Sequence, residues 1–257
     1  MGRVTAILSS SRAAALVILA IYLGAYYAEA ESLPSFSLWW DIAIISLLVI
    51  PPVFALVYFA LPLRTARWLL PAGIGVAVLA GLLQIVGLDV LANFAKLAAV
   101  TLLAWWFLGF FETAAWVVVV ALIVPWVDAV SVWRGPTKHI VTHQRELFTT
   151  FSFAFPVPGQ ANTAQLGLPD LLFFALFLAA SVRWELRPRL TWLLLTLSFG
   201  ATLAFAVWGE LGGLPALPLL ALGFLLANGD LIWTRLRRER AERSEEIGTR
   251  SSGRSEP

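Results

Sequence analysis

Two aspartates lie where an apolar sequence ordinarily carries no charge. Asp128 lies within WVVVVALIVPWVDAVSVW (116–133), and Asp170 lies near the start of the apolar part of TAQLGLPDLLFFALFLAAS (163–181). If these runs form consecutive membrane spans, Asp128 precedes the end of one span and Asp170 follows the beginning of the next. At about 1.5 Å per residue, both carboxyl groups then lie roughly 6–8 Å beneath the same membrane face.

The chemistry open to such a pair follows from its two charges. Two carboxyl groups within hydrogen-bonding distance do not both ionise easily, so one of them keeps a proton. The ionised group can take a proton from water while the protonated group polarises a peptide carbonyl. Because the pair titrates as a unit, the sequence does not assign acid and base separately. The two residues alone are equally compatible with a proton relay, an ion site or a hydrogen bond between helices.

The composition indicates that these aspartates belong to a membrane protein. Of the 257 residues, 60% are apolar and 13% charged, whereas soluble domains are about 25% charged. The chain has no cysteine, which excludes disulfides and thiolate chemistry. We therefore predict an all-α polytopic bundle of about eight spans, with a turn near Gly87 and Asp89 dividing the longest apolar stretch. The predicted spans are 12–30, 39–61, 68–87, 90–110, 113–133, 166–183, 190–208 and 214–234.

The first apolar run permits two interpretations. Early arginines, an apolar centre and the ending Ala28-Glu29-Ala30 are typical of a signal peptide. The apolar centre is long for a cleaved signal, so we interpret the run as the first span. Either interpretation gives the rest of the chain the same orientation.

The positive charges predict the orientation. With the N-terminus in the cytoplasm, 14 of the 18 lysines and arginines lie on the cytoplasmic side and three, all in the 134–165 loop, lie outside. Lys96 lies within a span and either snorkels or pairs with an acid. We therefore expect a multi-pass protein, in the cell membrane, with both termini in the cytoplasm.

A third feature lies at the start of the last span. In GGLPALPLLALG (212–223), Pro215 and Pro218 lack backbone donors and two glycines precede them, so 213–218 is predicted to be non-helical. Irregular backbone at membrane depth is tolerated beside a cavity or inside protein. The predicted orientation puts this segment level with both aspartates.

The sequence resembles the presenilin and signal peptide peptidase family of intramembrane aspartyl proteases. The resemblance rests on three motifs in order: WVDAVSVW with Asp128, GLPD with Asp170, and LPALP at 214–218. The segments ETAAW (112–116) and RGPTK (134–138) add to it. It covers about 112–234, which gives three parts: N-terminal helices 1–111, a catalytic core 112–234 with its external loop 134–165, and a basic, partly disordered tail 235–257.

The resemblance implies a presenilin-like fold and an aspartic endopeptidase that needs no metal or organic cofactor. It makes Asp128 and Asp170 the catalytic pair. It also implies a set of residues that bind substrate: Gly167, Leu168, Pro169, Leu214, Pro215, Ala216 and Leu217. The outside position of the 134–165 loop is similar to signal peptide peptidases, so the expected substrates are single-span segments with a cytoplasmic N-terminus, including leftover signal peptides.

The sequence departs from the family pattern at three points. Pro169 replaces the second glycine of the family motif, Val127 replaces the usual tyrosine, and eight spans replace the usual nine. The alternative function is that of a non-enzymatic membrane protein, either a proton-coupled transporter or an inactive relative that binds substrate without cutting it.

The remaining charged residues predict no further chemistry. His139 and His143 lack a third ligand, so we expect solvated loop histidines and no metal site. Asp41 and Asp230 lie close to span ends and are expected at the membrane interface. The arginine-rich tail is expected to meet anionic lipid and no nucleic acid.

Overall fold

The computed structural model describes residues 9–134, 149–209 and 214–252. Within them the chain is mostly helical, and a helix occupies each of the eight ranges that the apolar runs predict. The principal helices are α2 (Ser10–Glu29), α3 (Leu38–Ile44), α4 (Ile50–Ala60), α5 (Leu69–Ile85), α6 (Asp89–Leu108), α7 (Ala114–Arg134), α10 (Leu168–Arg183), α11 (Pro188–Trp208) and α12 (Leu217–Ser252).

Five helical segments of the described chain are long and apolar enough to cross a membrane, which indicates a membrane protein. Two further apolar helices, Leu69–Ile85 and Ala114–Val130, are shorter. The eight crossings therefore stay a prediction. The five segments are Ser10–Ser32, Leu38–Thr65, Asp89–Leu108, Pro188–Trp208 and Leu217–Arg238.

The second predicted span is not one regular helix. A π-helical turn (Ile45–Val49) separates α3 from α4, and a 3₁₀ turn (Leu61–Thr65) follows α4. Pro52 lacks the N–H that would bond to the carbonyl of Leu48, four residues earlier. The hydroxyl of Tyr22 donates to that carbonyl at 3.0 Å, so α2 satisfies a group that the proline leaves unpaired.

The longest apolar stretch folds back where the sequence predicts. α5 ends at Ile85, α6 begins at Asp89, and the two helices pack against each other. Gly87 between them has φ +80°, a left-handed conformation that glycine adopts without steric cost. The turn prediction is therefore confirmed.

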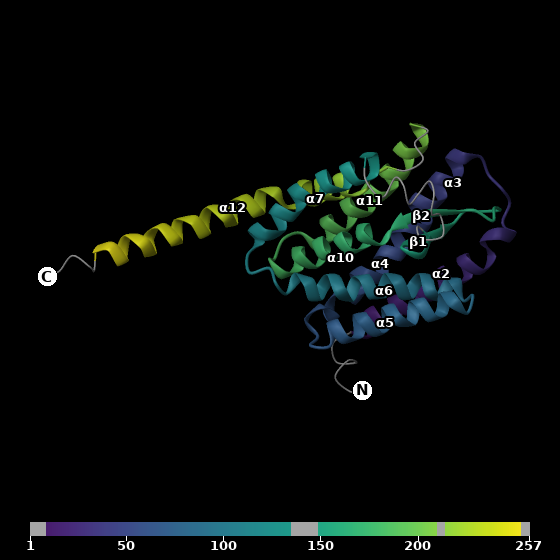
Figure 1. Cartoon of the computed structure of the whole chain (residues 1–257), viewed down its shortest axis with the longest axis horizontal. Coiled ribbons are helices and arrows are strands. Elements are labelled where there is room, and N and C mark those ends of the chain that lie inside the picture. The colour runs from purple at the N-terminus through teal and green to yellow at the C-terminus, as the bar shows by residue number, and fades with distance from the viewer. Residues whose placement is uncertain (1–8, 135–148, 210–213, 253–257) are drawn as a thin grey trace.

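α10, which begins two residues before Asp170, is the central helix of the bundle (Figure 1). It packs against α6, α11 and α12, and every side chain from Phe174 to Ala180 is buried. The ring of Phe54 lies 4.1 Å from that of Phe174 and 4.7 Å from that of Phe199. A helix that is apolar all round is expected in a core, and this one fixes the position of Asp170.

A β-hairpin lies in the segment that the sequence analysis treats as an irregular loop. β1 (Ser152–Pro156) pairs antiparallel with β2 (Thr163–Gly167), with Ala154 opposite Gln165. One face carries Phe153 and Phe155, both buried in the core, and the other carries the polar side chains. This period-two alternation is the reason why the segment folds as a hairpin.

Side chains from two helices hold the outer edge of β1. The amide of Asn93, on α6, donates to the carbonyl of Ala154 and accepts from its N–H, both at 2.8 Å. The hydroxyls of Tyr27 and Tyr26, on α2, donate to Ala154 and Pro156, each at 2.7 Å. α2 is thus packed into the fold as a first span would be.

Candidate active site

Asp170 is oriented by the junction between β2 and α10. Gly167 ends the strand with extended backbone and precedes the first turn of the helix, and Pro169 lies in that first turn. The backbone N–H of Gly167 faces the carboxylate of Asp170, an arrangement in which a side chain three residues inside the helix caps its start. A Cβ atom on Gly167 would lie 3.1 Å from Oδ2 of Asp170. The glycine therefore leaves room for the carboxyl group.

Asp128 faces the bundle from the C-terminal half of α7. The two preceding side chains, Trp126 and Val127, are 74% and 62% exposed, whereas Asp128 is half-buried. Val127, which departs from the family pattern, therefore points away from the protein interior. Pro125 lies within α7 one turn before Asp128 and leaves the carbonyl of Ala121 without its helical donor.

The LPALP segment meets Asp128 directly. The backbone N–H of Leu217 donates to Oδ2 of Asp128 at 3.2 Å. Leu217 is the first residue of α12, whose first turn carries unpaired N–H groups and a partial positive charge, so a carboxylate is stabilised there. Residues 214–216 are non-helical as predicted. Leu217 and Pro218 belong to the helix, because α12 begins at Leu217, and Gly213 lies outside the described residues.

The two aspartates are brought together by these elements. α10, which carries Asp170, contacts α7, which carries Asp128. Both side chains are half-buried. Of the other residues predicted for the site, Leu214 is half-buried and the three that follow it are buried. Before Asp170, Gly167 and Leu168 are half-buried and Pro169 is exposed. Two carboxyl groups, backbone donors and an irregular segment therefore converge at one end of the bundle.

β2 offers a free strand edge beside Asp170. Because the N–H and C=O of Ala154 point away from β2 toward Asn93, those of the opposite residue, Gln165, point away from β1. No hydrogen bond from the described residues reaches these groups of Gln165. The strand runs into Gly167, so its open edge leads to the first turn that carries Asp170.

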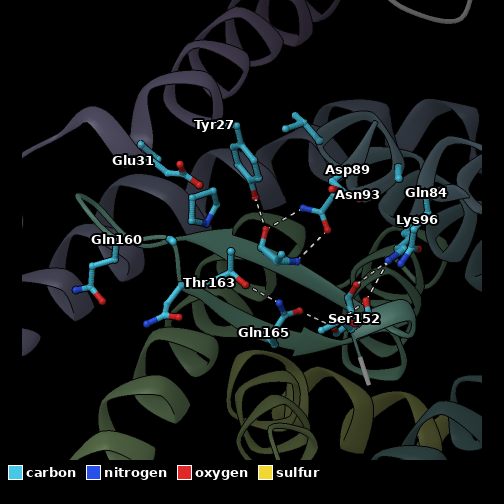
Figure 2. Close-up of a pocket in the computed structure, with 18 of the residues that line it drawn as sticks. Tyr27, Glu31, Gln84, Asp89, Asn93, Lys96, Ser152, Gln160, Thr163 and Gln165 are labelled. Carbon is cyan, nitrogen blue, oxygen red and sulfur yellow. Dashed lines mark hydrogen bonds between the residues drawn. The ribbon is translucent and has the colours of Figure 1, made fainter. Parts of the chain in front are cut away.

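A separate cavity of about 590 Å³ lies along the polar face of the hairpin, and neither aspartate lines it (Figure 2). Asn93, Gln165 and Ser152 project into the region, and Gln165 donates to the hydroxyl of Thr163 at 2.6 Å. Lys96 also lines the cavity, and its ammonium group donates to the carbonyls of Thr149 at 3.1 Å and Ser152 at 3.5 Å. Lys96 therefore holds the chain just before β1.

Two expectations for the other polar residues are corrected or refined. Asp41 lies in the first turn of α3, but it is buried within the protein: its side chain is only 3% exposed and accepts from Gln160 at 3.0 Å. Its second oxygen has no hydrogen-bond partner among the described residues. Asp230 is exposed, as an interfacial residue would be, and forms a two-pronged salt bridge with Arg187 at 2.6 and 2.8 Å.

Sequence reasoning missed the hairpin and the residues that hold it. The signal was present, because Phe residues recur at every second position in SFAFP and apolar residues do so in TAQLG, with a Pro-Gly turn between them. His139 and His143 lie outside the described residues. In comparisons with known proteins, no family model, curated protein or solved structure matches this chain.

Proposed function

We propose that the protein is an intramembrane aspartyl protease that hydrolyses peptide bonds within single-span or signal-peptide segments. The observation that carries the proposal is the meeting of Asp128 with both other motifs. Its carboxylate accepts from Leu217 at 3.2 Å, and its helix, α7, contacts α10, which carries Asp170. The closeness of elements that carry three motifs far apart in the sequence supports the proposal, because the resemblance to presenilins implies such an arrangement.

The chemistry is hydrolysis by a carboxyl pair that holds one proton. The ionised carboxylate takes a proton from water, and the water oxygen bonds to the peptide carbon. The protonated carboxyl hydrogen-bonds to the carbonyl oxygen, so a tetrahedral diol forms. Proton transfer to the peptide nitrogen then breaks the carbon–nitrogen bond and leaves a new carboxyl and a new amine.

A substrate helix has to unwind before this reaction, because its backbone hydrogen bonds hide the peptide bonds. The free edge of β2 can pair with an extended segment through the outward N–H and C=O of Gln165, in the mode of strand addition. Residues 214–216 add a second irregular backbone beside Asp128. Water is the nucleophile of the proposed reaction. The substrate span enters the site sideways from the lipid bilayer.

The test is cleavage of a model single-span peptide by the purified protein, with products identified by mass spectrometry. We expect Asp128→Asn and Asp170→Asn each to lower the cleavage rate by about a thousandfold or more, because the pair acts as a unit. Asp89→Asn, at an exposed position at the start of α6, is the matched control and is expected to cut normally.

Three outcomes would contradict the proposal. Equal products from wild type and both site variants would mean that another group performs the cleavage. Binding of the peptide with no cleavage by the wild type would assign the chain to an inactive relative, and proton-driven solute flux in sealed vesicles would assign it to a transporter.

A further inference from the structure

The end of the bundle opposite the hairpin is rich in arginine. The segments 183–189 and 230–238 contain six arginines and two acidic residues. One of these acids, Asp230, is already paired with Arg187. Five guanidinium groups therefore remain against the single carboxylate of Glu185, and this end of the described bundle carries a net positive charge.

Two of these arginines line a cavity of about 240 Å³ between α12 and the turn that follows α10. Arg235 donates to the carbonyl of Trp184 at 2.6 Å, which fixes its guanidinium group at the wall of the cavity. Arg238 lies one turn further along the same helix face, and no hydrogen bond or ion pair within the described part of the chain occupies it. Thr234, whose hydroxyl donates to the carbonyl of Asp230 at 2.9 Å, and the apolar Leu186 and Leu231 also line the cavity.

The cavity lies at the depth where lipid headgroups would be found. The apolar segment of α12 that is long enough to cross a membrane ends at Arg238. Trp184 and Trp233 lie at the same end. The guanidinium carbons of Arg183 and Arg237 lie over their rings, 5.0 and 4.9 Å from the ring centroids. Tryptophan and arginine together mark a membrane interface, whichever side of the membrane this end faces.

We propose that this cavity binds the phosphate of an anionic phospholipid. Arg235 and Arg238 supply donors for the phosphate oxygens, and the two leucines contact the glycerol and the first methylenes of the acyl chains. Glu185 offsets only part of the positive charge, which favours a headgroup with a net negative charge over a zwitterionic one. This inference goes beyond the proposed proteolysis and does not depend on it.

The experiment measures lipid binding by the full chain in detergent, with phosphatidylglycerol and phosphatidylcholine as probes. Native mass spectrometry gives the bound fraction, and tryptophan fluorescence gives the rise in unfolding midpoint relative to each variant's own lipid-free value. Arg235→Gln together with Arg238→Gln is expected to weaken phosphatidylglycerol binding about thirtyfold, since each arginine near an anionic surface contributes about a fivefold preference.

The matched control is Arg189→Gln together with Arg237→Gln, which removes the same charge from exposed positions outside the cavity. It is expected to bind phosphatidylglycerol nearly as well as the wild type. An equal loss in both double variants would overturn the proposal in favour of diffuse surface attraction. Equal stabilisation by inorganic phosphate or glycerol 3-phosphate would mean that the site takes a free phosphate. If the Arg235 variant does not fold, Arg238→Gln alone tests the same cavity, because that side chain makes no hydrogen bond within the described fold.

Discussion

The carboxylate of Asp128 has a structural role and a proposed catalytic role. Its Oδ2 accepts from the first N–H of α12, so it caps a helix of another part of the chain, and its own helix also contacts α10, which carries Asp170. A helix start buried without such an acceptor would leave its N–H groups unpaired. The same contact thus positions the LPALP segment and orients a proposed catalytic group, so changes at this contact affect folding and chemistry together.

Gly167 allows the two effects to be separated. Its φ of −60° and ψ of 140° suit alanine, but the added Cβ would lie 3.1 Å from Oδ2 of Asp170. We expect Gly167→Ala to change the free energy of unfolding by less than about 1 kcal/mol. Cleavage is expected to fall between about tenfold and a hundredfold, because a displacement well under 1 Å disturbs a proposed catalytic carboxyl.

The measurement pairs the cleavage assay with thermal unfolding. Gly75→Ala, on α5, is the control, because a Cβ there meets nothing within 4 Å. Wild-type cleavage by Gly167→Ala would show that the Asp170 carboxyl tolerates the added methyl group, and the idea that this glycine reserves space for it would be wrong.

Residue type alone did not distinguish the other aspartates. Asp41 and Asp230 both lie near the ends of apolar runs, and the sequence predicted the same interfacial position for each. Asp41 is buried, and Gln160, 119 residues later, donates to it from the hairpin turn. A contact between residues so far apart in the sequence cannot be recognised from the residues around Asp41. Asp230 is exposed, as its position near the end of an apolar run predicts.

At the scale of elements, the N–H at the middle of the outer edge of β1 depends on the side chain of Asn93. This amide bonds to both backbone groups of Ala154, as a neighbouring strand would. We expect Asn93→Ala to lower the free energy of unfolding by about 2 kcal/mol, because it leaves the N–H of Ala154 without a partner, whereas Tyr27 still donates to the carbonyl. Faster hydrogen exchange at the Ala154 amide, with unchanged helix content, is the specific readout.

Asn162→Ala is the control for this prediction, because Asn162 is exposed in the hairpin turn and contributes only its carbonyl, which accepts from Val157. Asn93→Asp keeps the acceptor and loses the donor, so it is expected to fall between wild type and alanine on the exchange scale. Unchanged exchange at Ala154 in Asn93→Ala would show that Tyr27 alone holds the edge.

The helices and the hairpin differ in how far the sequence could predict them. Apolar runs of about twenty residues mark helices strongly, and the turn at Gly87 is fixed by local chemistry. The π-helical turn before Pro51 and Pro52 depends on Tyr22, from another helix, which satisfies a freed carbonyl. Each strand of the hairpin has only five residues, and its apolar face is recognisable only against the core that it covers.

At the scale of the whole molecule, the arginine contacts and the hairpin lie at opposite ends of the helical bundle. Arg183 donates to the last residue of α6, Leu108, and Arg187 and Arg235 bond near the turn that follows α10. The hairpin contacts the opposite ends of α2 and α6. The arginine-rich end and the hairpin end are therefore distinct, and the positive-inside rule then predicts that the hairpin and the proposed active site face outward.

The absence of cysteine from the chain makes this orientation directly measurable. Ala161→Cys places a thiol at an exposed position in the hairpin turn, and Thr65→Cys places one at an exposed position at the other end of a predicted span. Ala161 is preferable to Gly159, where a Cβ would lie 2.5 to 2.8 Å from the backbone of residues 33–35. We expect a membrane-impermeant maleimide to label Ala161→Cys on intact cells and Thr65→Cys only after the membrane is opened.

The orientation has a consequence for substrates, because a proposed active site near the outer face selects the direction of the span that enters it. A substrate span with its N-terminus in the cytoplasm runs past the aspartates in one chain direction. A span inserted the other way would lie along the edge of β2 with the opposite chain direction. With the expected labelling, only peptides inserted with a cytoplasmic N-terminus should be cut in oriented vesicles. The reverse labelling pattern would turn the molecule over, and the preference for substrate direction would have to reverse with it.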